Sequence, residues 1–359
     1  MIRVLVVEDS PVIREFLVHV LSTDPLIRVI GMVSDGKEAL EAVARTKPNV
    51  ITMDIHMPKM NGLDATRQIM ETHPTPVVIV CGSSSAKDAT TAFEAIEAGA
   101  LAIVQRPAAI GHLDHEVSAA NLIQTVKLMS EVKVVGRWAR SRPPEVRPAV
   151  PPLAAVQVRR SPAEVKLIAL GASTGGPPVI QAILSKLPKS FPVPLLIVQH
   201  IAPGFIQGFV EWLAHTSLLP VHVARQGEPI VPGHVYVAPD EFQMKVGRTG
   251  EISLTKEKPQ NGHCPSVSYL FRSIATSYGQ HAIGVLLTGM GKDGAEELKL
   301  MREKGAVTIA QDRESSVIYG MPGEAIRLGS ATYVLSPGGI AAALISLAEG
   351  RSEDVDREK

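Results

Sequence analysis

Three carboxylates follow two short apolar runs near the start of the chain. Glu8 and Asp9 come directly after residues 3–7, and Asp54 comes directly after residues 49–53. Because ligands bind outside the carboxyl ends of parallel strands, these acids are predicted to lie together at one sheet edge. Carboxylates so close repel one another unless a cation lies among them, and Mg²⁺ is the natural partner. Each acid taken alone is better explained as a loop or turn residue.

A serine, a histidine and an aspartate follow three apolar runs in the second half. Ser173 lies in Gly-Ala-Ser-Thr-Gly-Gly-Pro (residues 171–177), His200 directly follows residues 194–199, and Asp293 lies in Leu-Thr-Gly-Met-Gly-Lys-Asp-Gly (residues 287–294). Such triads are defined by geometry, and their chain order varies among folds. We predict that His200 takes the hydroxyl proton of Ser173 during attack on a carbonyl, while Asp293 orients the imidazole and loop N–H groups face the oxyanion.

Other interpretations of these residues stay open at this point. The glycine-rich turn also fits an anion-binding turn, His200 also fits a structural role, and Asp293 also fits a helix N-cap. A nucleotide-dependent enzyme with a phosphate cradle at residues 171–176 would lack the Gly-Lys-Ser/Thr ending of a P-loop. Cys264 is disfavoured as a nucleophile because no His–acid pair accompanies it.

The elements that must position these residues alternate between strands and helices. Short runs rich in Val and Ile are typical of strands buried on both faces of a parallel sheet. In the first part, strands are predicted at residues 3–7, 28–33, 49–53, 76–80 and 101–104, and helices at 11–21, 36–45, 63–72, 89–98 and 117–129. In the second part, strands are predicted at 166–170, 194–199, 282–287, 306–310 and 332–335, and helices at 178–187, 205–216, 267–278, 295–303 and 338–348. The fold class is therefore α/β, with two doubly wound domains.

One stretch of the second part departs from this alternation. Residues 221–255 show apolar residues at every second position, with glycines and prolines between the runs. This pattern predicts antiparallel hairpins inserted at one edge of a mainly parallel sheet.

Length and composition agree with two domains and a tether. The chain has 359 residues, and residues 131–163 are rich in Pro and Arg, as expected for an extended linker. We expect a first domain at residues 1–130, a second at 164–350 and a charged tail at 351–359. The formal net charge is zero, which argues against nucleic-acid binding. Two cysteines and the lack of a targeting or membrane segment predict a cytoplasmic protein without membrane insertion.

The first domain resembles the receiver domain of two-component response regulators. The resemblance rests on Val-Val-Glu-Asp-Ser-Pro (residues 6–11) and Met-Asp-Ile-His-Met-Pro-Lys-Met-Asn-Gly (residues 53–62). It implies a flavodoxin-like domain of five parallel strands in which Asp54 accepts a phosphoryl group from a sensor histidine kinase of the CheA type. It also implies that Asp9, Asp54 and the backbone of His56 hold Mg²⁺, and that Glu8 completes the pocket.

Two receiver positions depart from the family pattern. Cys81 stands where receivers have Ser or Thr at the end of the fourth strand, and Arg106 stands where they have Lys. A thiol is a weak hydrogen-bond donor, whereas Arg keeps the positive charge on a longer, planar side chain. The hydroxyls of residues 83–85 are candidate substitutes for the missing one. We expect these changes to weaken the coupling between phosphorylation and activation.

The second domain resembles the catalytic domain of the CheB-type protein-glutamate methylesterases. The resemblance rests on residues 171–177, Val-Gln-His (198–200), Pro-Ser-Val (265–267) and residues 287–294. It implies Ser173 as nucleophile, His200 as base, Asp293 as orienting acid and the Met290 N–H as oxyanion donor, with Thr174 beside the nucleophile. The implied substrates are glutamate γ-methyl esters, and specific glutamines, of methyl-accepting chemoreceptors, with no cofactor for the esterase.

The resemblance leaves two matters open. The family commonly has Lys or Arg before Pro-Ser-Val and Asp after it, whereas this chain has Cys264 and Ser268. We interpret these positions as lying near the receptor-docking face, where they bear on receptor choice and leave the triad untouched. A rival from another class is a receiver-regulated adaptor that docks on receptors without catalysis. If the chain is an enzyme, the unphosphorylated receiver is expected to cover the esterase cleft in part.

Overall fold

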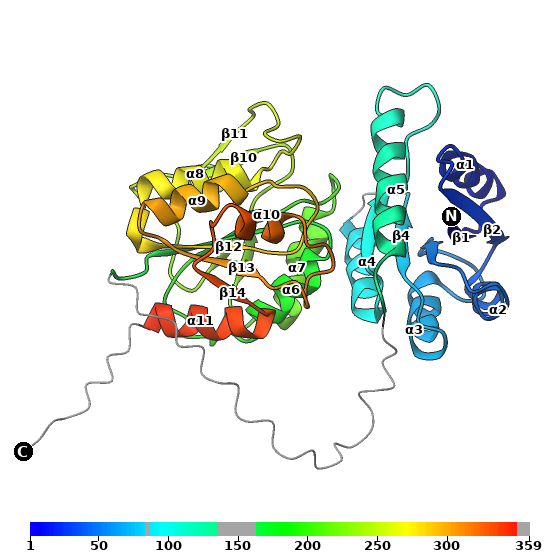
Figure 1. The fold of residues 1–359 in the computed structure, drawn as a ribbon, viewed down its shortest axis with the longest axis horizontal. Coiled ribbons are helices and arrows are strands. Elements are labelled where there is room, and N and C mark those ends of the chain that lie inside the picture. Colours follow the sequence, from blue (N-terminus) through cyan, green and yellow to red (C-terminus); the bar gives the residue numbers. More distant parts are fainter. Residues whose placement is uncertain (83–85, 135–162, 350–359) are drawn as a thin grey trace, which may run out of the picture. The chain divides into compact units, whose positions relative to one another are not determined.

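A computed structural model of the chain describes residues 1–82, 86–134 and 163–349, without the side chains of residues 86–88. The described residues form two compact units, which are treated separately below (Figure 1). Most of the predicted linker at 131–163 and all of the predicted tail at 351–359 lie outside the described residues. No helix in the described part of the chain has both the length and the apolar character needed to cross a bilayer.

The first unit is a five-stranded parallel sheet with helices on both faces. Its strands are β1 (Ile2–Val7), β2 (Ile27–Val33), β3 (Val50–Met53), β4 (Val77–Cys81) and β5 (Ala102–Gln105), in the order β2-β1-β3-β4-β5. Its helices are α1 (Pro11–Ser22), α2 (Gly36–Thr46), α3 (Gly62–Thr72), α4 (Ala86–Ala98) and α5 (His115–Ser130). Helix α1 contacts α5, and α3 contacts both α2 and α4. This strand order is the flavodoxin-like one, and the predicted alternation is confirmed.

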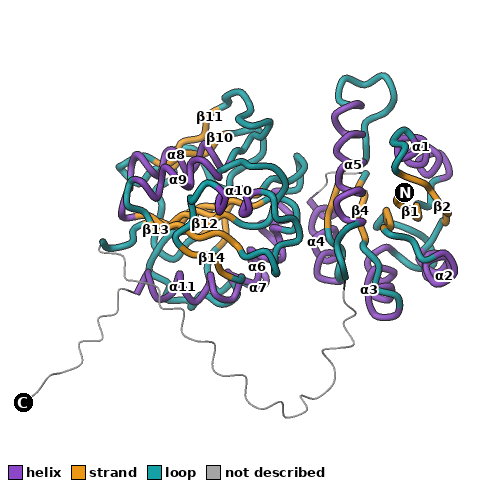
Figure 2. The backbone as a smooth tube through the Cα atoms, viewed as in Figure 1, coloured by secondary structure: helices purple, strands orange, loops and turns teal. Residues whose placement is uncertain are grey.

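The second unit is built on a seven-stranded sheet in which every neighbouring pair is parallel. Figure 2 draws the strands in orange and the helices around them in purple. Its strands are β6 (Leu167–Ala172), β7 (Leu195–Gln199), β8 (Val221–Val223), β9 (Val235–Val237), β12 (Ala282–Leu286), β13 (Val307–Gln311) and β14 (Tyr333–Leu335), in the order β14-β13-β12-β6-β7-β9-β8. The predicted helices are α6 (Gly176–Leu184), α7 (Ile206–Thr216), α8 (Val267–Ser277), α9 (Ala295–Glu303) and α11 (Pro337–Glu349). Helices α8 and α9 lie on one side of the sheet, and α6 and α11 lie on the other (Figure 1).

The antiparallel part of this unit is smaller than the sequence pattern predicts. Of the strands in the described part of the chain, only β10 (Gln243–Val246) and β11 (Ile252–Thr255) pair antiparallel, whereas β8 and β9 are parallel edge strands of the main sheet. The connection between β8 and β9 leaves the sheet and bonds to that hairpin: the Gly227 N–H donates to the Ile252 carbonyl, and the Ile230 N–H donates to the Gly250 carbonyl. The detour lets β9 return in the same direction as β8.

One helix was not predicted. The seven-residue α10 (Met321–Arg327) contains Pro322 and Gly323, which interrupt the apolar periodicity that marks the other helices. Its first residue, Met321, is fully buried, and its N–H donates to the Gly289 carbonyl in the loop after β12. The helix therefore supports a loop that lies at the candidate site.

Candidate functional site

The three predicted triad residues stand at the ends of three neighbouring strands. Strand β6 lies between β12 and β7, so Ser173 follows the central strand, His200 follows one neighbour, and the loop with Asp293 follows the other. Chain order along the sheet reverses at β6, because β7 and β9 lie on one side of it and β12 to β14 lie on the other. This is the switch point at which open α/β sheets bind their ligands.

The backbone ties Ser173 to the loop after β12. The Ser173 N–H donates to the Thr288 carbonyl at 3.0 Å, and Ser173 is nearly buried. A Cβ added to Gly289 would lie 2.6 Å from the Cβ of Ser173, so only glycine permits this close approach. The loop that carries Met290 therefore begins directly against the serine.

A buried glutamine joins the ends of β6 and β7. The Gln199 Nε2 donates to the Ser173 carbonyl at 2.9 Å and to the His200 carbonyl at 2.8 Å, and Gln199 is only 2% exposed. The sequence analysis missed this role. The signal for it was a long polar side chain at the last position of an otherwise apolar strand, because a buried amide needs hydrogen-bond partners.

His200 and Asp293 form a close pair. The Nε2 of His200 lies 3.0 Å from the Oδ2 of Asp293, and their side chains are 7% and 1% exposed. An ionised carboxylate only accepts hydrogen bonds, so Nε2 carries the proton and Nδ1 has the free lone pair. The Nδ1 atom is buried and has no hydrogen-bond partner among the described residues. The ring is therefore reversed relative to serine proteases of the chymotrypsin type, where Nδ1 binds the aspartate.

The carboxylate of Asp293 lies at the N-terminus of α8. Besides His200, it accepts bonds from four groups, namely the Val267 N–H, the Ser268 N–H, the Ser266 hydroxyl and the Asn261 amide. Burial by itself raises the pKa of Asp293, but the bonds from His200, Asn261 and Ser268, with the charge of His200, hold it well below its usual range. Asp293 is therefore ionised, and it does not cap α9, whose N-cap is Gly294.

Ser268 contacts the acid of the triad, whereas the sequence interpretation had this departure leave the triad untouched. Its side chain is buried, and its hydroxyl accepts bonds from the Gly294 N–H at 2.9 Å and the Asn261 amide at 3.2 Å. The departure from the family pattern therefore sits beside Asp293, where the Ser268 N–H reaches Oδ1 at 3.3 Å. Residue 268 lies within the shell that surrounds the acid.

The glycine-rich turn leaves little room for a phosphate. A Cβ on Gly171 would meet the Val267 side chain at 2.3 Å, and a Cβ on Gly176 would meet the Gln199 Oε1 at 2.2 Å. These two glycines serve close packing, not ligand approach. Gly175 adopts a left-handed φ of 77° and caps α6 without a side chain. The packing argues against the nucleotide-cradle interpretation.

The remaining esterase candidates differ in their surroundings. Met290 is 44% exposed. The N–H of the preceding residue, Gly289, donates to the Ile318 carbonyl. The Thr174 carbonyl accepts a bond from the Thr288 hydroxyl at 3.0 Å. Burial, with a contribution from Glu241, raises the pKa of the Cys264 thiol, which keeps it in its unreactive form.

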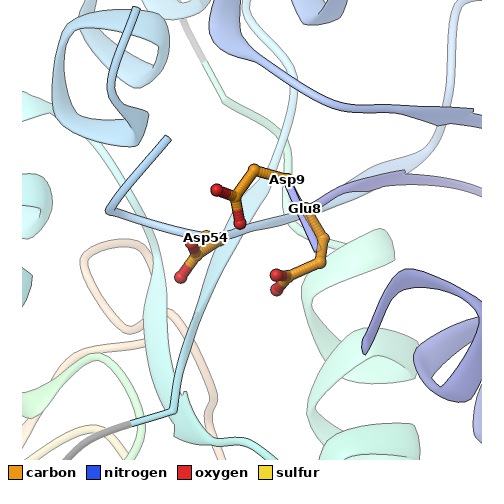
Figure 3. A group of neighbouring side chains, drawn as sticks. All are labelled: Glu8, Asp9 and Asp54. Atoms are coloured by element: carbon orange, nitrogen blue, oxygen red, sulfur yellow. The ribbon is translucent and has the colours of Figure 1, made fainter. Parts of the chain in front are cut away.

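The first unit brings together the three predicted carboxylates. One ligand oxygen from each of Glu8, Asp9 and Asp54 lies within 4.8 Å of the others, and the side chains extend from two strand ends toward one region (Figure 3). Burial and the neighbouring Asp54 raise the pKa of Glu8 to about 7, and burial also raises the pKa of Asp54. Oxygen ligands in a crowded, partly buried group suit Mg²⁺, which would relieve the repulsion.

Glycine and charge shape the rest of this pocket. A Cβ on Gly62 would meet the Asp54 carbonyl at 2.0 Å, so the start of α3 packs directly on the Asp54 loop. The Arg106 guanidinium lies over Gly82, where a Cβ would be 2.5 Å from its Nη2. Burial raises the pKa of Glu8 and of Asp54, and the charge of Arg106 opposes that shift in both.

Cys81 is buried, and its carbonyl accepts the Arg106 N–H. The hydroxyls of residues 83–85 lie outside the described residues.

Comparisons with known proteins agree with both units. Residues 4–118 match the response regulator receiver domain, and residues 168–344 match the CheB methylesterase domain. The second unit is similar to the crystal structure of the Thermotoga maritima CheB methylesterase catalytic domain, with a TM-score of 0.50, 38% identity, and coverage of 52% of this chain and all of that one. Fold and sequence thus define a receiver followed by a methylesterase domain.

Relatives that match this chain over nearly its full length identify its family. The chain is 60% identical to a protein-glutamate methylesterase/protein-glutamine glutaminase of Nitrosospira multiformis, over 98% of this chain and 99% of that protein. It is 56% identical to protein-glutamate methylesterase/protein-glutamine glutaminase 4 of Geobacter metallireducens, over 97% and 99%. The chain belongs to the family of CheB-type protein-glutamate methylesterases/protein-glutamine glutaminases. The predicted family, fold class and enzyme class are confirmed.

Proposed function

We propose that this chain hydrolyses glutamate γ-methyl esters on the cytoplasmic helices of methyl-accepting chemoreceptors, and that it deamidates specific glutamines there. The observation that carries the proposal is the placement of Ser173, His200 and Asp293 after three adjacent parallel strands, with His200 hydrogen-bonded to Asp293 at 3.0 Å. The substrate class follows from the named activity of the relatives. Such a substrate places the enzyme in the cytoplasm.

The reaction begins at Ser173. The Nδ1 of His200 takes the hydroxyl proton as the serine oxygen attacks the ester carbonyl, and the ionised Asp293 stabilises the imidazolium that forms. Collapse of the tetrahedral intermediate breaks the bond to the methoxy group, which leaves as methanol with the proton from His200. Water then attacks the acyl-serine by the same route and releases glutamate. For a glutamine substrate the leaving group is ammonia.

The oxyanion is assigned to the loop after β12. The Met290 N–H is the proposed donor, with Thr174 beside the nucleophile. Gly289 packs directly on Ser173, but the N–H of Gly289 already donates to the Ile318 carbonyl, so the next N–H in the loop is assigned to the oxyanion. Removal of one such donor typically costs about 2.7–4 kcal/mol of barrier. No step in this scheme requires a cofactor.

The receiver supplies regulation in this proposal. Asp54 is the proposed acceptor of a phosphoryl group from a CheA-type sensor kinase, and Asp9, Asp54 and the His56 carbonyl, with Glu8, would hold Mg²⁺. The support is the cluster of carboxylates in Figure 3 and the receiver family match. Bound Mg²⁺ would offset the charge on the transferring phosphoryl oxygens. Arg106 would bind the phosphoryl group, in the place where receivers use lysine.

The activity is tested with the full chain and methylated chemoreceptor in membrane vesicles. Radiolabelled methyl groups should be released as methanol, and mass spectrometry of receptor peptides should show specific glutamines converted to glutamate. A small phosphodonor with Mg²⁺ should raise the rate. Unchanged methylation, with receptor binding retained, would instead indicate the adaptor.

A further inference from the structure

A second imidazole lies flat against His200. The rings of His200 and His263 are stacked, with centroids 3.8 Å apart and planes only 6° from parallel. The triad as described above makes no use of His263. Aromatic rings gain from such packing, and a ring held on one face cannot turn freely about its side-chain bonds. The stack therefore bears on the orientation of the proposed base.

A tight turn fixes the place of His263. The N–H of His263 donates to the Gln260 carbonyl at 2.9 Å, and the N–H of Gln260 donates back to the His263 carbonyl at 3.0 Å. The two residues between them, Asn261 and Gly262, have φ values of 52° and 83°. Two consecutive left-handed residues closed by such a pair of bonds define a hairpin turn of type I′, for which Asn-Gly is the preferred sequence.

The turn is also anchored from outside. The Gln243 side chain donates to the His263 carbonyl at 3.1 Å and accepts the Ser266 N–H at 2.9 Å. Gln243 is fully buried at the start of β10. The antiparallel hairpin thus holds the chain on both sides of residues 264 and 265.

The same turn contacts the acid of the triad. The Nδ2 of Asn261 donates to the Oδ1 of Asp293 at 3.0 Å and to the Ser268 hydroxyl at 3.2 Å. Oδ1 is the oxygen that does not face His200, because the imidazole bonds to Oδ2. One turn therefore touches two members of the triad, the carboxylate through Asn261 and the imidazole through His263.

The charge state of His263 suits a place beside the base. Burial, together with the neighbouring His200, lowers the pKa of His263 to about 4, although Asp293 partly opposes the shift. His263 is therefore neutral near pH 7. A neutral ring tolerates an imidazolium on its face, whereas a charged ring would oppose proton uptake by His200.

His263 is not itself the base. The carboxylate that would orient a base, Asp293, is hydrogen-bonded to His200. His263 instead stacks its ring face on His200. A base oriented by a third group is the arrangement expected of a serine hydrolase. His263 acts through His200, which makes it a positioning residue.

We propose that the turn of residues 260–263 is a positioning element of the esterase site, in which His263 fixes the ring plane of His200 and Asn261 fixes the carboxylate of Asp293. The inference rests on the proposed function of the triad. It adds two residues that act on catalysis without touching the substrate.

The first experiment compares His263→Ala with His263→Phe in the full chain, using methanol release from methylated receptor. Loss of the stacked ring should lower kcat by about 10–100-fold with little change in KM, because small misplacements of catalytic groups have effects of this size. Phenylalanine keeps a flat neutral ring and should restore kcat to within about threefold of the wild-type value, with an unchanged pH profile. His281→Phe, at the opposite end of β12, is the matched control and should behave as wild type.

The second experiment reads the His200 ring directly. In ¹⁵N-histidine NMR spectra, the wild-type chain should show His200 as a single tautomer with the proton on Nε2. His263→Ala and Asn261→Ala should shift or broaden these signals, and His263→Phe should preserve them. Wild-type signals and kcat in folded His263→Ala would overturn the inference. Because the NMR readout needs no turnover, it separates this outcome from failure of the proposed function, which Ser173→Ala tests.

Discussion

His200 meets Asp293 through its Nε2 atom, 3.0 Å from Oδ2, which leaves Nδ1 as the ring nitrogen with a free lone pair. The buried Nδ1 has no hydrogen-bond partner in the described part of the chain. His200 and Asp293 follow strands that lie on opposite sides of β6. In the mechanism proposed above, Nδ1 rather than Nε2 is therefore the atom that takes the serine proton.

Asp293→Asn should remove most of the activity. In serine proteases the equivalent change lowers kcat by about 10⁴-fold by favouring the wrong tautomer, and a loss of about 10³–10⁴-fold is expected here. The Asn side chain would also turn a donor toward one of the N–H groups at the start of α8. Circular dichroism should accompany the rate measurement, and a folded variant with near wild-type kcat would contradict the assigned role.

The raised pKa of Glu8 predicts that the stability of the receiver depends on pH. Its folded pKa of about 7 exceeds the unfolded value of about 4.3, so its contribution is fully present below pH 4 and is lost as the pH rises through 7. Urea unfolding of the full chain without Mg²⁺ should show the receiver transition weakening between about pH 4.5 and 7, the interval between the two pKa values, and levelling off above it. Glu8→Gln should flatten this dependence, and added Mg²⁺ should stabilise the wild type more at pH 8. An equal slope in Glu8→Gln would refute the assignment.

Gly82 and Arg106 should be coupled in the response to phosphorylation. A methyl group at residue 82 would displace the Arg106 guanidinium, which lies 2.5 Å from that position. Gly82→Ala should lower the stimulation of esterase rate by a small phosphodonor about fivefold, equivalent to roughly 1 kcal/mol from one charged hydrogen bond. The effect should shrink in an Arg106→Lys background. Equal effects in both backgrounds would show that the two residues act independently.

Asp35 should be a determinant of receiver stability. It caps α2 by accepting the Lys37 and Glu38 N–H groups at 2.9 and 3.0 Å, and it pairs with Lys59 at 2.6 Å. Asp35→Ala should lower the free energy of unfolding by about 1–2 kcal/mol. Glu41→Ala, at an exposed position of the same helix, is the control. A loss no larger than that of the control would exclude the capping role.

The sequence predicted the strand ends well because parallel sheets place chemistry there. Glu8, Asp54, Ser173 and His200 each follow an apolar run, and the structure finds each beyond a strand. Residues 221–255 were harder, because period-two alternation does not state which neighbour a strand pairs with. The parallel pairing of β8 and β9 depends on bonds from Gly227 and its neighbours to a hairpin that follows later in the chain.

The surroundings of Asp293 were also beyond sequence reasoning. Four of its five donors come from residues 261–268, which lie 25–32 residues earlier in the chain, and the fifth, His200, lies 93 residues earlier. No local sequence pattern indicates contacts at that range. The Asn261-Gly262 dipeptide is a turn signal that the sequence analysis did not use. What it could not reveal was that the turn would stack His263 on His200. For the same reason, the sequence analysis did not foresee that Ser268 contacts Asp293.

Ser173→Ala tests the central claim most directly. Methanol release from methylated chemoreceptor should be measured for the full chain, for this variant and for Ser185→Ala, which removes an exposed hydroxyl at the end of the helix that follows Ser173. The account predicts that Ser173→Ala releases no methanol above the uncatalysed rate while Ser185→Ala keeps the wild-type rate. Methanol release by folded Ser173→Ala at the wild-type rate would contradict it.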